Sequence, residues 1–228
     1  ETLSSAVSAL VFAVGWKAHS LNPQRNVLIL ACGFLGVAIL DFSHMLSFAG
    51  MPDYITPNSV AKGINFWLPA RYLGALTLLG AVALHWRVPG DAAAPGPGRF
   101  LVLALVLAVV AVIHAVVFLF PQWYPQTYDD QGLTRFKIAS EYGVVALYAA
   151  SLGVLLHWAR ERAAFDVARL FAAVWVMALS EFFFTFYVVA TDPFNLLGHV
   201  YKVVGYYYLY RAIFVGTIEA PYRVLKQS

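Results

Sequence analysis

The stretch Phe100-Leu-Val-Leu-Ala-Leu-Val-Leu-Ala-Val-Val-Ala-Val-Ile-His114-Ala-Val-Val-Phe-Leu-Phe120 decides the fold class of this sequence. It is a continuous apolar run in which His114 is the only polar side chain. An α-helix needs about 20 apolar residues to cross a bilayer, whereas barrel strands alternate apolar and polar residues over roughly ten. Because a lipid-spanning chain must satisfy its backbone internally, the run predicts a transmembrane helix and not a barrel strand.

The composition of the whole chain agrees with a membrane protein. Of the 228 residues, 61% are hydrophobic and 12% are charged, and the mean hydropathy is +0.71. Soluble domains carry about a quarter charged residues, so the composition excludes a soluble enzyme and a disordered tail. A net charge of +3 is too small to indicate a nucleic-acid partner. The single cysteine, Cys32, excludes an internal disulfide and a CxxC site.

Six further apolar segments resemble the first in length, and proline- and glycine-rich breakers separate them. The sequence therefore predicts an all-α integral membrane fold, a bundle of seven transmembrane helices in one domain without internal repeats. The predicted helices cover residues 1–17, 27–50, 65–86, 99–120, 137–159, 167–190 and 196–217.

The distribution of Lys and Arg predicts the orientation of the bundle, because short cytoplasmic loops are enriched in these residues. One side would hold ten of them: Lys17, Arg25, Arg87, Arg99, Arg160, Arg162, Arg169, Arg211, Arg223 and Lys226. The other side would hold five: Lys62, Arg71, Arg135, Lys137 and Lys202. We therefore expect the N-terminus outside and the C-terminus in the cytoplasm.

Ionisable side chains within the predicted helices share one depth. With helix ends at Gly50 and Ala190, His44 would lie about 9 Å, and Asp41 and Glu181 about 14 Å, from the outer end. Placing a charged side chain within a membrane span costs roughly 2.5–3.5 kcal/mol of insertion free energy, so each one needs a pairing partner or a functional role. The group that falls in the outer half comprises Asp41, His44, Arg71, His114, Glu141, Glu181, His199 and Lys202.

A purely structural role is open for several of these residues. The four charges Asp41, Arg71, Glu181 and Lys202 suit an ion-pair network between helices. The i, i+4 spacing of Lys137 and Glu141 favours a surface pair at a helix start. His114 suits either an interhelical hydrogen bond or a ligand, and the functional interpretation is better for His44 and His199.

The functional alternatives are a metal, a haem or an organic ligand. Zinc or copper would suit His44 and His199, with Asp41 as a further ligand or orienting carboxylate. The same two imidazoles suit axial haem ligation. Arg71 and Lys202 suit a carboxylate, phosphate or quinone oxygen instead, with hydrogen bonds from His44, Glu181 and Tyr206.

Four segments of the chain contain most of these polar residues. They are Asp41-Phe-Ser-His44-Met-Leu-Ser-Phe-Ala-Gly-Met51-Pro-Asp53, Phe66-Trp-Leu-Pro-Ala-Arg71-Tyr, Ser180-Glu181-Phe-Phe-Phe-Thr185 and Asn195-Leu-Leu-Gly-His199-Val-Tyr-Lys202. In these segments the chain resembles the third type of membrane-associated sensor domain, an N-terminal sensory module of bacterial histidine kinases and diguanylate cyclases. The resemblance covers residues 1 to about 225. It implies that Glu1, Asp41, His44, Arg71, Glu181, His199 and Lys202 occupy the family's polar positions.

On this resemblance we expect a multi-pass sensor of the bacterial inner membrane that is not itself an enzyme. A ligand or metal ion in the outer polar pocket would shift the helix packing. The last helix would carry that shift through Arg211, Glu219 and Pro221 to a cytoplasmic output domain. Residues 1–228 would then be one domain of a longer, dimeric signalling protein, with a further helix upstream. The rival interpretations are a zinc-dependent intramembrane hydrolase and a haem-binding redox sensor.

Overall fold

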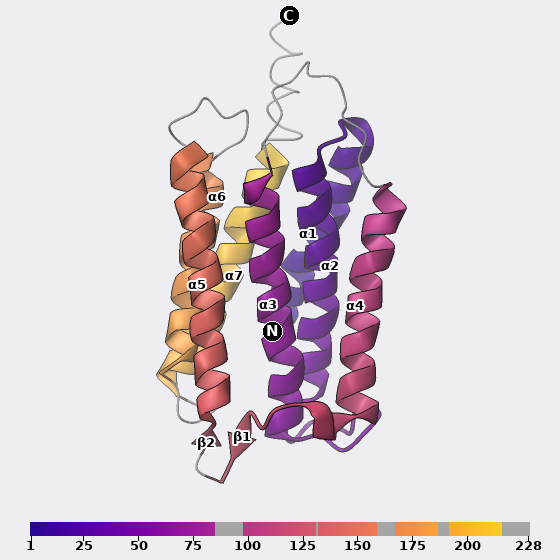
Figure 1. Ribbon diagram of the computed structural model, residues 1–228, viewed down its shortest axis with the longest axis vertical. Helices are drawn as coiled ribbons and strands as arrows, with labels where there is room; N and C mark the ends of the chain where they lie inside the picture. The colour runs from indigo at the N-terminus through magenta and orange to yellow at the C-terminus, as the bar shows by residue number, and fades with distance from the viewer. Residues whose placement is uncertain (85–97, 131, 159–166, 187–191, 216–228) are drawn as a thin grey trace, which may run out of the picture.

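The computed structural model describes residues 1–84, 98–130, 132–158, 167–186 and 192–215. Within these residues, α-helices run side by side as one bundle, and two short strands form a hairpin between the fourth and fifth helices (Figure 1). The prediction of a helical bundle is confirmed. The elements are α1 (Thr2–Leu21), α2 (Arg25–Leu46), α3 (Val60–Ala83), α4 (Arg99–Leu119), η1 (Pro121–Trp123), β1 (Tyr128–Asp129), β2 (Gly132–Leu133), α5 (Arg135–Trp158), α6 (Val167–Phe184) and α7 (Pro193–Phe214).

The order of the helices in space brings the first helix and the last helix into contact. Helix α1 packs on α2 and on α7, α2 packs on α3, and α6 packs on α7 and α5. Helix α4 lies at the edge of the bundle, mainly against α2 (Figure 1). We call the end that carries β1 and β2 the hairpin end of the bundle.

Within the described residues, five helices are long and apolar enough to cross a membrane: α2, α3, α4, α5 and α6. Helix α4 is the most apolar of these helices. Only 11% of its most apolar 18-residue stretch is buried, as expected of a helix that faces lipid on most sides. The chain is therefore a multi-pass membrane protein. Glu219 and Pro221 lie outside the described residues, as do Arg87, Arg160, Arg162, Arg223 and Lys226.

Helix α2 ends at Leu46, four residues before the predicted end at Gly50. The side chain of Asn58 donates a hydrogen bond to the carbonyl of Leu46 at 2.8 Å, and Gly50 has a φ of +96°. A left-handed residue of this kind suits a turn and not a helix. His44 consequently lies about 3 Å from the end of its helix and not about 9 Å.

The starts of α3 and α7 also differ from the predicted ones, because side-chain caps extend both helices. Ser59 accepts the backbone N–H of Lys62 at 3.0 Å, so α3 begins at Val60. Asp192 accepts the backbone N–H of Phe194 at 2.9 Å, so α7 begins at Pro193. Helix α6 ends at Phe184, and residues 187–190 of the predicted span lie outside the described residues.

Glycines allow α6 and α7 to approach closely. A Cβ at Gly198 would lie 2.6 Å from the ring of Phe184, and one at Gly205 would lie 2.7 Å from the side chain of Met177. The same approach lets the Ser180 hydroxyl donate to the Gly198 carbonyl at 2.7 Å. The polar half of α7 is thereby held against α6.

Candidate functional site

Five charged side chains form a continuous series that we call the ion-pair chain: Glu1, Lys202, Asp41, Arg71 and Glu181. Lys202 Nζ pairs with the Glu1 carboxylate and lies 3.3 Å from Asp41 Oδ2. Asp41 Oδ1 accepts from Arg71 Nη2 at 2.5 Å, and Arg71 Nη1 lies 3.8 Å from Glu181 Oε1. The series links the N-cap residue of α1 to α7, α2, α3 and α6.

Two histidines meet this series at Glu1. Nδ1 of His199 lies 2.8 Å from Glu1 Oε1, and Nε2 of His44 lies 3.7 Å from the same oxygen. His44 is three residues from Asp41 on α2, and His199 is three residues from Lys202 on α7, so each imidazole shares a helix face with a chain member. All seven residues that the resemblance implies therefore belong to one cluster.

The cluster is open to its surroundings at one end only. The side chains of Glu1, His44 and His199 are 12%, 14% and 27% exposed, whereas those of Lys202 and Arg71 are 1% exposed. We call the three partly exposed residues the open end. A molecule that approaches the ion-pair chain meets the open end first.

A backbone carbonyl fixes the orientation of His44. Its Nδ1 lies 2.8 Å from the carbonyl oxygen of Gly63 on α3, to which it donates. That donation leaves the lone pair of Nε2 directed to the side of Glu1. Imidazoles that bind metals or protons are commonly held in this way by a carbonyl on the other nitrogen.

Tyr206 contributes an aromatic wall to the cluster. Its buried ring lies 5.7 Å from the guanidinium carbon of Arg71, and the ring of Trp67 lies 5.8 Å from the same atom. Cation–π contacts of this length favour a charged guanidinium in a dry site. Tyr206 thus lies beside the ion-pair chain and supports Arg71.

Some polar atoms in the buried part of the cluster have no hydrogen-bond partner among the described residues. They include Nε of Arg71 and Oε2 of Glu181, both on buried side chains. Buried polar groups are nearly always paired with protein, water or ligand. The inner part of the cluster therefore has unused capacity to bind a water molecule or a polar ligand group.

Lys137 and Glu141 are not a surface pair, so that prediction is wrong. Both side chains are fully buried and pair with each other, and Lys137 Nζ donates to the Phe184 carbonyl at 3.3 Å. The ring of Trp67 lies 5.1 Å from the same ammonium. The i, i+4 spacing is the same for an exposed and a buried pair, so the sequence carried no signal that distinguished them.

His114 lies away from the open end and forms an interhelical contact. Its Nε2 lies 2.8 Å from the Ser43 hydroxyl on α2, and its Nδ1 lies 2.8 Å from the Val110 carbonyl on its own helix. Both ring nitrogens therefore have partners. Of the two interpretations that the sequence leaves open, the interhelical hydrogen bond is the one found here.

The formal charges of the ion-pair chain do not cancel. Three carboxylates face two cationic groups, so the chain has one negative charge in excess while both imidazoles are neutral. The excess lies beside two nitrogen atoms that bind protons or metals. Among the described residues, no group of three or more His, Cys, Asp and Glu side chains is arranged to hold a metal ion.

Comparison with known proteins assigns the chain to a family. A family model described as a membrane-associated sensor domain, MASE3, matches residues 1–221. No curated protein and no solved structure matches the chain. The match covers nearly the whole sequence, including every residue of the ion-pair chain and the open end. The protein therefore belongs to the MASE3 family of membrane-associated sensor domains.

Proposed function

We propose that this chain is the sensory input domain of a longer signalling protein and that it detects a small cationic ligand at the open end. The observation that carries the proposal is the position of Lys202, which pairs with the accessible carboxylate of Glu1 and also lies beside Asp41. A cation that binds Glu1 competes with Lys202 for that carboxylate. Binding at the surface of the cluster would thus change the pairing inside it.

The chemistry of the open end favours a positively charged ligand. Arg71 and Lys202 are already paired with carboxylates, so an anion would have to displace an internal partner. A cation instead compensates the excess negative charge. An organic amine would satisfy the Glu1 carboxylate in the way that Lys202 does. One carboxylate and two imidazoles are also donors that zinc or copper prefers, although His44 and His199 would have to move to hold a metal ion together.

The last helix is the proposed route of the signal. Lys202 and His199 both lie on α7, and α7 packs on α1 and α6. When Lys202 loses Glu1, its remaining partner is Asp41 on α2, so α7 would move relative to α1. A sensor needs a ligand that binds two states with different affinity, and the exchange of partners at Lys202 supplies such states.

The proposal includes the placement of the protein in the cell. Helices α1 and α7 run alongside the five apolar helices (Figure 1), and we propose that they also span the membrane, giving seven spans. The open end would face outward and the C-terminus would lie in the cytoplasm. The cytoplasmic output would be a histidine kinase or diguanylate cyclase domain of a dimeric bacterial inner-membrane protein.

A binding experiment tests the ligand class directly. The domain is purified into lipid nanodiscs and titrated with zinc sulfate, copper sulfate and ethylamine, with calorimetry and melting temperature as readouts. Ligand binding raises the melting temperature as the ligand concentration exceeds Kd. We expect saturable binding of at least one of these cations, weakened tenfold or more by His199→Gln and by Glu1→Gln.

The matched control is His19→Gln. His19 lies near the other end of α1, where it contacts the backbone of Gln24, so its loss removes an imidazole without touching the open end. Unchanged binding in the His199→Gln and Glu1→Gln variants would refute the proposed site. Saturable binding of acetate but of none of the cations would refute the ligand class.

Movement of α7 is tested by spin labels at Ser20→Cys on α1 and Tyr208→Cys on α7, with Cys32 replaced by alanine. Both labelled positions are exposed. We expect the distance between the labels to change when the cation binds. A distance distribution that is identical with and without bound cation would refute the route through α7.

A further inference from the structure

A cavity lies at the hairpin end of the bundle, apart from the ion-pair chain. Its volume is about 450 Å³, and it is formed by the start of α3, the end of α4 and the segment 121–127. No member of the ion-pair chain or of the open end lines it. Cavities of about 300–1,000 Å³ are typical of small-molecule sites.

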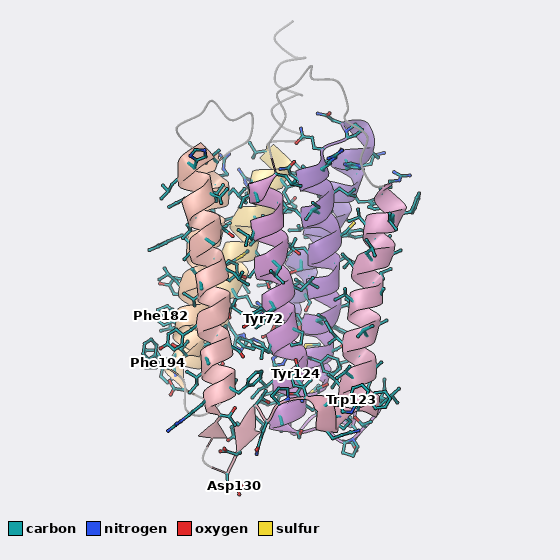
Figure 2. All side chains as sticks on the ribbon, in the orientation of Figure 1. Tyr72, Trp123, Tyr124, Asp130, Phe182 and Phe194 are labelled. Atoms are coloured by element: carbon teal, nitrogen blue, oxygen red, sulfur yellow. The ribbon has the colours of Figure 1, made fainter. Side chains whose placement is uncertain are left out.

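One side of the cavity is apolar. Val117 and Phe118 come from α4, and Tyr124 and Pro125 come from the segment that follows η1. Figure 2 shows Tyr124 at the hairpin end near the base of α3, while Trp123 lies by the end of α4. This wall suits a flat or branched hydrocarbon group.

A buried lysine lies beside this wall, with its Nζ 5.3 Å from the centre of the Phe118 ring. Lys62 is 7% exposed, and its Nζ donates to the carbonyls of Tyr54 and Thr56 at 2.6 and 2.8 Å and to Oδ1 of Asn58 at 3.0 Å. All three acceptors are uncharged. Among the described residues, no carboxylate forms an ion pair with Lys62, so its positive charge is not neutralised by an acid in direct contact. Buried charges are normally paired.

Two further hydrogen-bond donors line the cavity. Oδ1 of Asn65 accepts from the Thr127 hydroxyl at 3.0 Å, and the amide NH₂ of Asn65 has no partner in the described part of the chain. The hydroxyl of Tyr124 likewise has no hydrogen-bond partner there, although the side chain is half-buried. The cavity thus combines two unused donors with an ammonium that contacts backbone carbonyls and the rings of Tyr54 and Phe118 but no carboxylate among the described residues.

We propose that this cavity binds a small organic carboxylate with an apolar body. Its carboxylate would accept from the Asn65 amide and the Tyr124 hydroxyl and would lie in the field of Lys62. Its body would pack on Val117 and Phe118. Two ligands of this chemistry are a soluble aromatic acid that enters from the aqueous side and a short fatty acid that enters from the bilayer.

The cavity is physically connected to the open end through α3. Gly63, whose carbonyl holds His44, lies between Lys62 and Asn65 in the sequence. Pro69 lacks an N–H and so leaves α3 one backbone hydrogen bond short on the way to Arg71. A ligand that contacts Lys62 and Asn65 would therefore shift the first turn of α3, where the Gly63 carbonyl orients His44. This coupling rests on the proposed function, whereas binding at the cavity does not.

The binding test uses benzoate as the probe and benzamide as its uncharged counterpart, with the domain in phosphatidylcholine nanodiscs. We expect benzoate to bind at least tenfold more tightly than benzamide. Tyr124→Phe keeps the ring and removes one hydrogen bond, so it should weaken benzoate binding about three- to tenfold. Octanoate is the second probe and represents a fatty acid that enters from the bilayer. Tighter binding of octanoate than of benzoate would indicate that the natural ligand comes from the bilayer.

Tyr72→Phe is the matched control, because the Tyr72 hydroxyl donates to the Ser140 carbonyl and does not line the cavity. Equal binding of benzoate and benzamide would overturn the proposal, as would equal benzoate binding by Tyr124→Phe and the unmodified chain. Asn65→Leu removes the amide donor and should also weaken benzoate binding. If that variant does not fold, Tyr124→Phe still decides the outcome.

Two further measurements separate this proposal from the proposed function. In the absence of added cation, benzoate binding should be unchanged in Glu1→Gln, which removes one carboxylate of the open end but no residue that lines the cavity. Coupling between two sites is reciprocal, so saturating benzoate should change the affinity for the bound cation. If benzoate binds without changing that affinity, the coupling is refuted and the cavity site stands.

Discussion

Lys202 on α7 and Asp41 on α2 face each other inside the bundle, with Nζ 3.3 Å from Oδ2. The same ammonium pairs with Glu1, so one cation serves two carboxylates from different helices. In a membrane interior such a cation is hard to replace, because each carboxylate is costly to bury alone. Loss of the Lys202 ammonium should therefore destabilise the bundle.

Lys202→Met is expected to destabilise the domain by about 3–5 kcal/mol, because it leaves two carboxylates without their shared cation. Lys202→Arg keeps the positive charge and should lose much less stability. The measurement is the melting temperature of the detergent-solubilised domain. Lys17→Met is the control, since it makes the same substitution near the far end of α1, where the side chain is exposed. Equal melting temperatures for Lys202→Met and Lys17→Met would contradict the prediction.

A double-mutant cycle on Asp41 and Arg71 should show strong coupling. Asp41→Asn leaves Arg71 with its longer contact to Glu181, and Arg71→Gln leaves Asp41 with Lys202, so each single variant removes the shortest partner of a buried charge. The double variant removes both charges. We expect the double variant to lose less stability than the sum of the single losses, with a coupling energy of about 0.5–3 kcal/mol. Additive losses would show that the 2.5 Å contact contributes no net energy.

The buried Lys137–Glu141 pair is expected to tolerate joint replacement by apolar residues. The double variant Lys137→Met with Glu141→Leu should be as stable as the unmodified domain or more stable, because it removes the cost of burying two charges. Each single substitution should be destabilising. Cation binding at the open end is the functional readout, and it should stay unchanged in the double variant. Loss of cation binding there would mean that this pair belongs to the sensing site.

His114→Leu should reduce stability by about 1 kcal/mol through loss of the hydrogen bond to Ser43. It should leave cation affinity unchanged, because His114 does not contact Glu1. His199→Gln should show the opposite pattern, with a small effect on the melting temperature and a large effect on affinity. The two histidine variants are therefore compared in the same titration. A similar loss of affinity in both would refute the assignment of His114 as a packing residue.

Tyr124 is expected to stay protonated as the pH rises through about 10, the ordinary pKa of a tyrosine. Burial raises the pKa of Tyr124 above this value, because the charged phenolate is disfavoured away from water. Above pH 10 the unfolded chain releases this proton more easily than the folded chain does, so stability should fall there. The difference in phenolate absorbance between Tyr124→Phe and the unmodified domain measures the titration. Ionisation of Tyr124 near pH 10 would contradict the burial of its hydroxyl.

The sequence predicts the helical bundle well because the signal is local. The apolar run after Arg99 places α4 within one residue of its observed bounds. The end of α2 could not be predicted in this way, because the hydrogen bond from Asn58 to Leu46 depends on how the intervening loop folds. The spacing of apolar residues along a helix gives no information about such hydrogen bonds from a loop.

The candidate site could be predicted only in part. Asp41 and Arg71 stand out as charges in apolar helices, but Glu1 and Lys202 are 201 residues apart, and only the family resemblance placed Glu1 in the site. The cavity beside Lys62 left no signal in the sequence, because ordinary residues from three separate segments form it. The combination of polar and apolar side chains in the cavity can be recognised only after the chain has folded and the three segments lie together.

The pairing of Glu1 with Lys202 also has a consequence for biosynthesis. At roughly 5–20 residues per second, a ribosome needs on the order of 10–40 s to add the 201 residues that separate these two positions. During that interval the Glu1 carboxylate lacks its ammonium partner, whereas Asp41 can already pair with Arg71 on α3. The pair between Glu1 and Lys202 can form only after α7 has been synthesised. A stalled chain that lacks α7 would leave Glu1 without this cation, which distinguishes it from a finished protein.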